Sequence, residues 1–217
     1  MGCAPARATP VLARPVWQHS AGVRSFTGAA PPSHLIQSPS LEITATFSPP
    51  AEGEYAPFYA GYIALASKGD LPRRLEAQIQ EVSGLLRGLS EEEALFRYAP
   101  GKWSVKEVAG HLADTERIMA YRALRIARGD TTPLPGFDEN TFVVTANFDA
   151  RPLSSLVEEW ETVRRASILL LRGFDAEAAG RAGTVSGGPM TARALGYIIA
   201  GHVAHHLEIL RTRYSLA

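Results

Sequence analysis

Two histidines near the end of the chain, His202 and His206, have a spacing suited to metal chemistry. They lie four residues apart, so a helix would carry both on one face, one turn apart. That face is otherwise aliphatic, through residues such as Leu195 and Ile199. A buried neutral imidazole needs partners for its ring nitrogens, and one metal ion can bridge two imidazoles at this spacing. The spacing alone leaves open both a metal site and a pair of core histidines with buried hydrogen-bond partners.

A third ligand for such an ion would have to come from another segment. His111 lies near the border of the apolar stripe of a second helical segment, and it becomes a candidate if the two helices face each other. Three imidazoles would leave coordination positions for water or substrate, which is the pattern of a reactive site. His205 falls towards the edge of its own stripe, so we expect it to be solvated or to support a ligand rather than to bind the ion.

Carboxylates close to these histidines allow two interpretations. Asp114 is one turn from His111 and could orient its ring through the second nitrogen. The simpler interpretation is that Asp114 and Glu116 are a solvated acidic pair on a helix surface. Glu208 likewise could support a ligand, or could pair on the surface with Arg211 three residues later.

Four amphipathic segments would position these residues. Apolar residues recur every three or four positions in each of them, which predicts helices over about 71–89, 105–128, 152–173 and 192–214. Asp70 and Thr191 are suitable N-caps for the first and the fourth, and Ser104 opens the second with a capping box. An aromatic-rich segment, 54–67, is expected to pack as a lead-in. No alternating pattern of useful length indicates a strand, so the sequence predicts an all-α four-helix bundle.

The connection at 131–150 is long for a helical bundle, and its sequence PGFDENTFV is unusual enough to suggest a function. The candidates for substrate contact in it are Asp138, Glu139 and Asn140. The alternative is a structural crossover that three phenylalanines anchor to the bundle, Phe137, Phe142 and Phe148.

Charge and cysteine content exclude several classes of protein. The 22 basic and 22 acidic side chains give a net charge of zero, which argues against a nucleic-acid-binding protein and against electrostatic binding to a membrane surface. No apolar run reaches the roughly 18 residues of a membrane-spanning helix. Cys3 is the single cysteine, so an intramolecular disulfide and a cysteine-based metal site are excluded. We expect a cytoplasmic protein without nucleic-acid or membrane partners.

Residues 1–53 differ in composition from the rest, and we expect a poorly structured extension ahead of a bundle domain at 54–217. Arg7, Arg14 and Arg24 precede the first acidic residue, Glu42, and no helical or alternating period persists. A start codon assigned too early, with the protein beginning near Leu41, and a plain flexible tail are the favoured explanations. A transit peptide is the third, although the proline content suits an amphipathic transit helix poorly.

Two segments resemble the DinB/YfiT-like superfamily. Residues 98–116, YAPGKWSVKEVAGHLADTE, are similar to its pattern of a Lys-Trp-Ser turn followed by a helix with His-Leu-x-Asp. Residues 201–208, GHVAHHLE, resemble its closing His-x-x-His-His segment, and the loop at 135–140 is similar to a stretch in one branch of it. The resemblance extends from about residue 66 to the C-terminus.

This resemblance implies a fold, a cofactor and an activity. The fold would be an up-down-down-up bundle, usually a homodimer, with one divalent ion on His111, His202 and His206. Zinc or nickel is expected first, and iron or manganese are alternatives. Members are proposed to be metal-dependent hydrolases, or transferases that use a low-molecular-weight thiol such as bacillithiol or mycothiol on a small-molecule substrate. The competing hypothesis is a non-catalytic dimeric bundle that serves as a binding or stress-response module.

Overall fold

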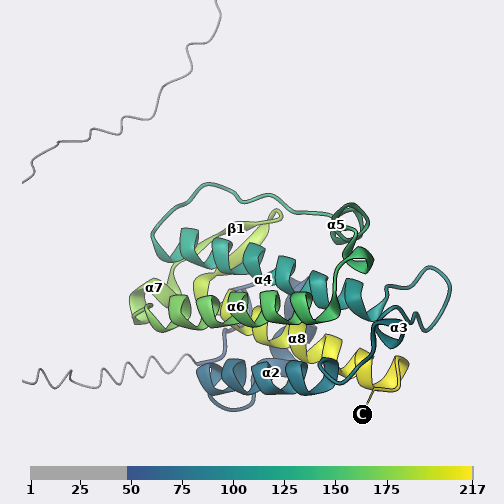
Figure 1. The fold of residues 1–217 in the computed structure, drawn as a ribbon. Coiled ribbons are helices and arrows are strands. Elements are labelled where there is room, and N and C mark those ends of the chain that lie inside the picture. The colour runs from purple at the N-terminus through teal and green to yellow at the C-terminus, as the bar shows by residue number, and fades with distance from the viewer. Residues whose placement is uncertain (1–47, 217) are drawn as a thin grey trace, which may run out of the picture. The chain divides into compact units, whose positions relative to one another are not determined.

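Four long helices form a bundle in the computed structural model, which describes residues 48–216 (Figure 1). They are α2 (Leu71–Leu86), α4 (Val105–Ala127), α6 (Leu153–Arg172) and α8 (Ala192–Arg213). Shorter elements precede or join them: η1 (Pro57–Tyr59), α1 (Ala60–Ala66), α3 (Glu91–Ala94), α5 (Glu139–Ala146), η2 (Phe148–Ala150) and α7 (Ala176–Gly180). The predictions for residues 1–47 lie outside the described residues, and the boundary at residue 53 stays a prediction.

The order of directions is up-down-down-up, which confirms the expected fold. Helices α4 and α6 run from right to left in Figure 1, and α2 and α8 run the opposite way. Helix α4 packs against both α6 and α8, and α2 packs against the same two helices. Since α4 and α6 are parallel neighbours, the chain must return along the whole bundle between them. This requirement explains the long connection over residues 128–152.

Local capping determines where three of the long helices begin. The Asp70 carboxylate accepts a hydrogen bond from the Arg73 backbone N–H at 2.9 Å, and the Thr191 hydroxyl accepts one from the Ala194 N–H at 3.2 Å. Ser104 and Glu107 form the predicted capping box, because each side chain accepts from the other residue's backbone N–H. These side chains satisfy amide groups that the helix itself leaves unpaired. The first long helix ends at Leu86, three residues earlier than predicted.

A short hairpin corrects the expectation that the chain forms no strand. Strands β1 (Ala182–Val185) and β2 (Gly188–Thr191) pair antiparallel across a turn in which Ser186 and Gly187 both have positive φ, 50° and 80°. Two positive φ values suit the type I′ hairpin turn. Leu134 of the long connection pairs with β1, and Tyr55 of the lead-in pairs with β2. The hairpin therefore holds both segments in place, although four-residue strands are too short to show a clear alternation.

The long connection is also more ordered than a loop. Asp138 caps α5 by accepting backbone hydrogen bonds from Asn140 and Thr141, at 3.0 and 3.4 Å. Asn147 ends α5 in a left-handed conformation with φ 51°, and η2 follows directly. Phe148 is buried against the bundle, whereas Phe142 remains 43% exposed. The connection is thus a helical crossover, anchored by the buried Phe148 and by Phe137, which packs partly buried against the core.

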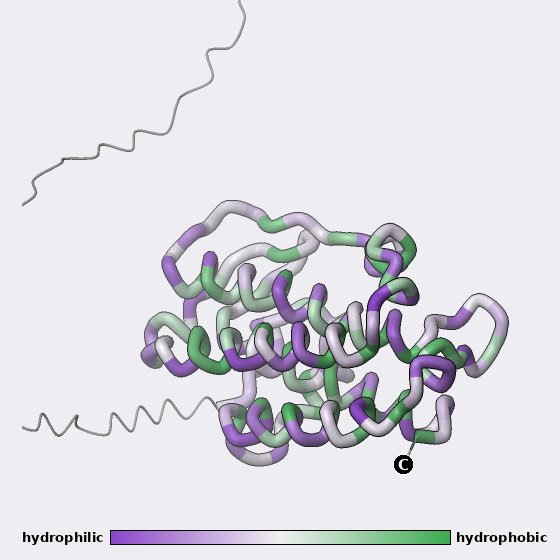
Figure 2. Tube along the Cα trace, in the orientation of Figure 1, coloured by the Kyte–Doolittle hydropathy of each residue, from purple (hydrophilic) through white to green (hydrophobic). Residues whose placement is uncertain are grey.

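A buried polar network joins all four long helices. Arg164 on α6 donates to both carboxylate oxygens of Glu116 on α4, and to Gln78 Oε1 on α2 at 2.6 Å. Gln78 in turn donates to the Ala200 carbonyl on α8 at 2.7 Å. On α4, Glu116 lies between two clusters of buried apolar side chains. Figure 2 shows hydrophobic and hydrophilic positions alternating along the helices. The interpretation of Glu116 as a solvated surface residue was wrong, because it is 2% exposed.

Two glycines allow short elements to touch the long helices. A Cβ on Gly201 would overlap the Tyr62 carbonyl oxygen of α1, and one on Gly110 would overlap the Phe148 ring of η2. Each glycine directly precedes one of the three histidines proposed as metal ligands. The missing side chains therefore let η2 and α1 pack directly against the two helices, α4 and α8, that carry these histidines.

We predict that Gly201→Ala destabilises the protein by about 1–3 kcal/mol, because backbone atoms of α1 must move to admit the methyl group. Gly84→Ala on α2 is the matched control, since nothing lies within 4 Å of its added Cβ. Alanine's helix propensity should stabilise that variant by up to about 1 kcal/mol. Urea unfolding of both variants measures the difference, and equal stabilities would contradict the close packing at Gly201.

Candidate metal centre

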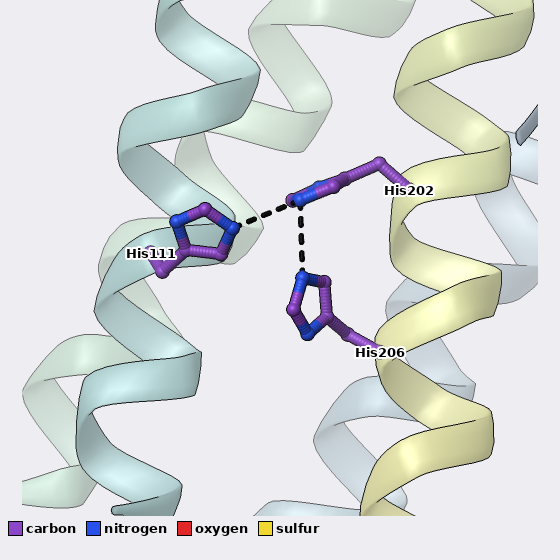
Figure 3. Close-up of side chains that lie close together, drawn as sticks. All are labelled: His111, His202 and His206. Atoms are coloured by element: carbon purple, nitrogen blue, oxygen red, sulfur yellow. Dashed lines mark hydrogen bonds between the residues drawn. The ribbon is translucent and has the colours of Figure 1, made fainter. Parts of the chain in front are cut away.

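The three predicted histidines meet between α4 and α8. His111 projects from α4, and His202 and His206 project from successive turns of α8, with their rings pointing toward one another (Figure 3). His202 Nε2 lies 2.9 Å from His111 Nε2 and 3.1 Å from His206 Nε2. All three side chains are buried, and one potential ligand atom from each lies within 4.8 Å of the other two.

Hydrogen bonds among the rings cannot satisfy this arrangement. Burial lowers the pKa of His111 to about 4 and lowers the pKa values of His202 and His206 well below the ordinary value, so all three rings are neutral near pH 7. The Nε2 atom of neutral His202 carries either one proton or one lone pair, and only one of its two short contacts can be a hydrogen bond. A divalent ion could use all three lone pairs at once, since nitrogens about 2.1 Å from one ion lie about 3.0 to 3.4 Å apart at octahedral to tetrahedral angles.

Thr115 supports His111 from one turn further along α4. Its hydroxyl oxygen lies 3.3 Å from His111 Nδ1. If Nε2 faced an ion, Nδ1 would carry the proton and donate a hydrogen bond to this hydroxyl, which would select the tautomer and orient the ring. Asp114, the residue considered for this role, instead pairs with Arg117 at 3.6 Å. Sequence reasoning missed Thr115, for which the available signal was its four-residue spacing from His111.

Aromatic side chains surround the histidines. The Trp103 ring lies 4.7 Å from that of His111 and stacks nearly parallel to that of His206 at 6.5 Å. The Tyr62 ring contacts the edges of His202 and His205, at 5.6 and 5.5 Å. These rings limit the access of water, which strengthens electrostatic interactions at the centre. His205 is partly exposed and stands outside the converging group of three.

A cavity of about 490 Å³ opens onto the three histidines. Its walls include the aromatic side chains, Arg122 of α4 and a part of the long connection that contributes Phe137 and Glu139. Of the three polar residues proposed for substrate contact, Glu139 lines this cavity, and Asn140 lines a second cavity of about 250 Å³ beside Trp103 and His206. Asp138 is used as the cap of α5. The larger cavity, of about 490 Å³, has the size of a binding site for a small molecule.

None of the helices within residues 48–216 combines the length and the apolar composition that a membrane crossing requires.

The sequence is similar to a known family and to a named bacterial protein. Residues 74–210, which include all three histidines, match the family model described as the DinB superfamily. A protein of Oceanobacillus iheyensis named "Putative metal-dependent hydrolase" is 26% identical over 73 residues, which are 33% of this chain and 42% of that protein. The chain thus matches less than half of this relative's length.

A solved structure shares the fold. YfiT from Bacillus subtilis, described as a probable metal-dependent hydrolase with an unusual four-helix bundle topology, superposes with a TM-score of 0.59 at 19% sequence identity. The superposition covers 68% of this chain and 87% of YfiT. At this identity the likeness establishes the arrangement of the helices, and the chemistry has to be argued from the site itself.

Proposed function

We propose that this chain, which belongs to the DinB superfamily, is a metal-dependent hydrolase that holds one divalent ion on His111, His202 and His206. The observation that carries the proposal is the meeting of three neutral, buried Nε2 atoms beside a cavity of about 490 Å³. The names of the Oceanobacillus iheyensis protein and of YfiT support hydrolysis as the reaction.

The residues of the chain would each have a defined task. A bound divalent ion supplies Lewis acidity, which polarises a carbonyl or phosphoryl oxygen and makes water more acidic. The three neutral imidazoles would leave the positive charge of the ion uncompensated, and Thr115 would keep the His111 ring in the binding tautomer. Trp103 and Tyr62 would exclude bulk water from the reacting group. The cavity would bind a small-molecule substrate.

Finer parts of the proposal rest on the family resemblance. Zinc or nickel is the proposed ion, three imidazoles with open positions also suit iron, and manganese is the remaining alternative. A low-molecular-weight thiol as second substrate, which would make the protein a transferase, and a homodimeric assembly stay predictions. The alternative of a non-catalytic binding module shares the metal site with the enzyme but predicts no turnover.

The test combines metal removal with a substrate panel. Purified protein would be treated with a chelator, reloaded with one equivalent of zinc, nickel, manganese or iron, and assayed on nitrophenyl esters, anilides and phosphate esters. Parallel assays would offer cysteine or glutathione with an electrophilic chlorodinitrobenzene. We expect at least one reaction that the chelator abolishes and one equivalent of ion restores. Activity that survives complete metal removal would contradict the proposal, and one bound ion without turnover on any substrate would favour the binding module.

A further inference from the structure

Arg122 is a buried arginine without a carboxylate beside it. Its side chain is 3% exposed on α4, and its guanidinium donates to the Pro135 carbonyl at 2.6 Å and to Met119 Sδ at 3.4 Å. It also hydrogen-bonds Tyr59 and lies 5.6 Å from the centre of the Phe137 ring. Within residues 48–216, no ion pair of 4.0 Å or less includes Arg122.

A second buried arginine, Arg164 on α6, shows what the position of Arg122 lacks. Arg164 is fully buried, and Glu116 neutralises its charge through three short hydrogen bonds. Removing a guanidinium from water is costly unless an opposite charge or a complete set of acceptors replaces the water. Arg122 has only neutral partners among the hydrogen bonds described, so its charge is left for a ligand to compensate.

Arg122 lines the same cavity as the three histidines. It follows His111 by eleven residues on α4, about three helical turns, so the two share one face of the helix. Thr115 lies between them on that face, and it lines the cavity as well. The Cα atoms of His111 and Arg122 are about 16 Å apart along the helix axis. Helical side chains lean towards the N-terminus, so the side chain of Arg122 is directed back towards His111.

One acidic residue, Glu139, lines the same cavity as Arg122. Glu139 lines it from the long connection, but its side chain is exposed, and its charge acts on Tyr62, whose pKa it helps to raise after burial. Glu139 forms no ion pair with Arg122 within 4.0 Å in the described structure. The cavity therefore has the three histidines in one part, a buried positive charge in another and a carboxylate at the solvent side.

We propose that Arg122 binds an oxyanion of the substrate, a carboxylate or a phosphate group, while the bond to be hydrolysed lies at the three histidines. A guanidinium presents a planar fork of N–H donors that matches two oxygens of such a group. The substrate class is then a small anionic ester, amide or related molecule whose charge is separated from its reactive bond by a short spacer. This inference rests on the proposed function for the position of the reactive bond.

The probes are alkyl hydroxamic acids of increasing chain length that end in a carboxylate, a phosphonate or a neutral carboxamide. Their hydroxamate group chelates a metal ion, and their far end can reach Arg122. Titration calorimetry on zinc-loaded protein should show about 10- to 100-fold tighter binding of an anionic probe than of its carboxamide, at one or two chain lengths. Preference between carboxylate and phosphonate assigns the oxyanion.

Substitutions test whether Arg122 causes the preference for anionic probes over neutral ones. Arg122→Met, which keeps the length and removes the charge, should bring the anionic and neutral probes to equal affinity, and Arg122→Lys should retain part of the difference. Arg128→Met is the control, because Arg128 is exposed at the C-cap of the same helix and is not among the residues that line the cavity. Equal binding of both probe types by wild-type protein at every length would overturn the inference, as would a preference that survives in Arg122→Met.

Titrations of metal-free protein distinguish the proposed anion site from the proposed metal centre. Simple dicarboxylates and alkylphosphonates would be titrated into chelator-treated wild-type and Arg122→Met protein. Binding that requires Arg122 here, together with no hydroxamate binding to zinc-treated protein, would refute the metal centre and support the anion site. Tight binding of the neutral hydroxamates with no effect of any anionic end would support the metal centre and refute the anion site.

Discussion

Replacing His202 with alanine is expected to reduce the bound divalent ion from one per chain to none. His202 Nε2 is the atom that both other rings approach, at 2.9 and 3.1 Å, so its loss removes the central donor of the group. Loss of a supporting residue near a metal lowers affinity about 10- to 100-fold, and loss of a ligand should exceed this range. Elemental analysis after gel filtration measures the ion content of wild type and variant.

His205→Ala is the matched control for this experiment, because His205 is the neighbouring imidazole on α8 that stands outside the group of three. It should keep one ion per chain. The ligand assignment would fail if His202→Ala retained a full equivalent of ion, or if His205→Ala lost it to the same extent. A His111→Ala, His206→Ala double variant that still bound one ion would contradict the assignment equally.

Glu116→Ala is expected to cost about 3–5 kcal/mol of unfolding free energy, the largest stability effect that we predict. The substitution leaves the Arg164 guanidinium fully buried with no negative partner. It also interrupts the network that ties α4 and α6 to Gln78 of α2. Urea unfolding at pH 7, with circular dichroism as the probe, measures the loss.

An exposed ion pair provides the comparison. Glu76 and Arg172 pair on the surface with nearly half of each side chain exposed, so Glu76→Ala should change stability by less than about 1 kcal/mol. In the Glu116→Ala background, Arg164→Met should recover part of the loss by removing the uncompensated charge. A Glu116→Ala variant no less stable than Glu76→Ala would show that the buried network contributes little.

Helix positions were predictable because their causes are local. Periodic apolar residues and the caps at Asp70, Ser104 and Thr191 act within a few residues, and the structure places the helices accordingly. The hairpin was missed because its strands have four residues each and owe their pairing to a two-residue turn. The order within the long connection was missed because Leu134 becomes ordered through pairing with β1, far along the sequence.

The site was only partly predictable, because it too depends on contacts between residues that are far apart in the sequence. Spacing on one helix places His202 and His206 on one face, but the approach of His111 depends on how α4 packs against α8, and the family resemblance supplied it. Glu116 finds its partner 48 residues away on α6, so no local pattern distinguishes it from a surface charge. Arg122 borders the cavity only because the long connection folds over it at Pro135.

A crystal structure of metal-loaded protein with anomalous diffraction data would show whether the three histidines hold one metal ion. We predict a single ion about 2.0–2.1 Å from the Nε2 atoms of His111, His202 and His206, with at least one further position filled by water or substrate. An ion bound at other residues, or an empty group of three histidines in protein equilibrated with excess zinc or nickel, would contradict it.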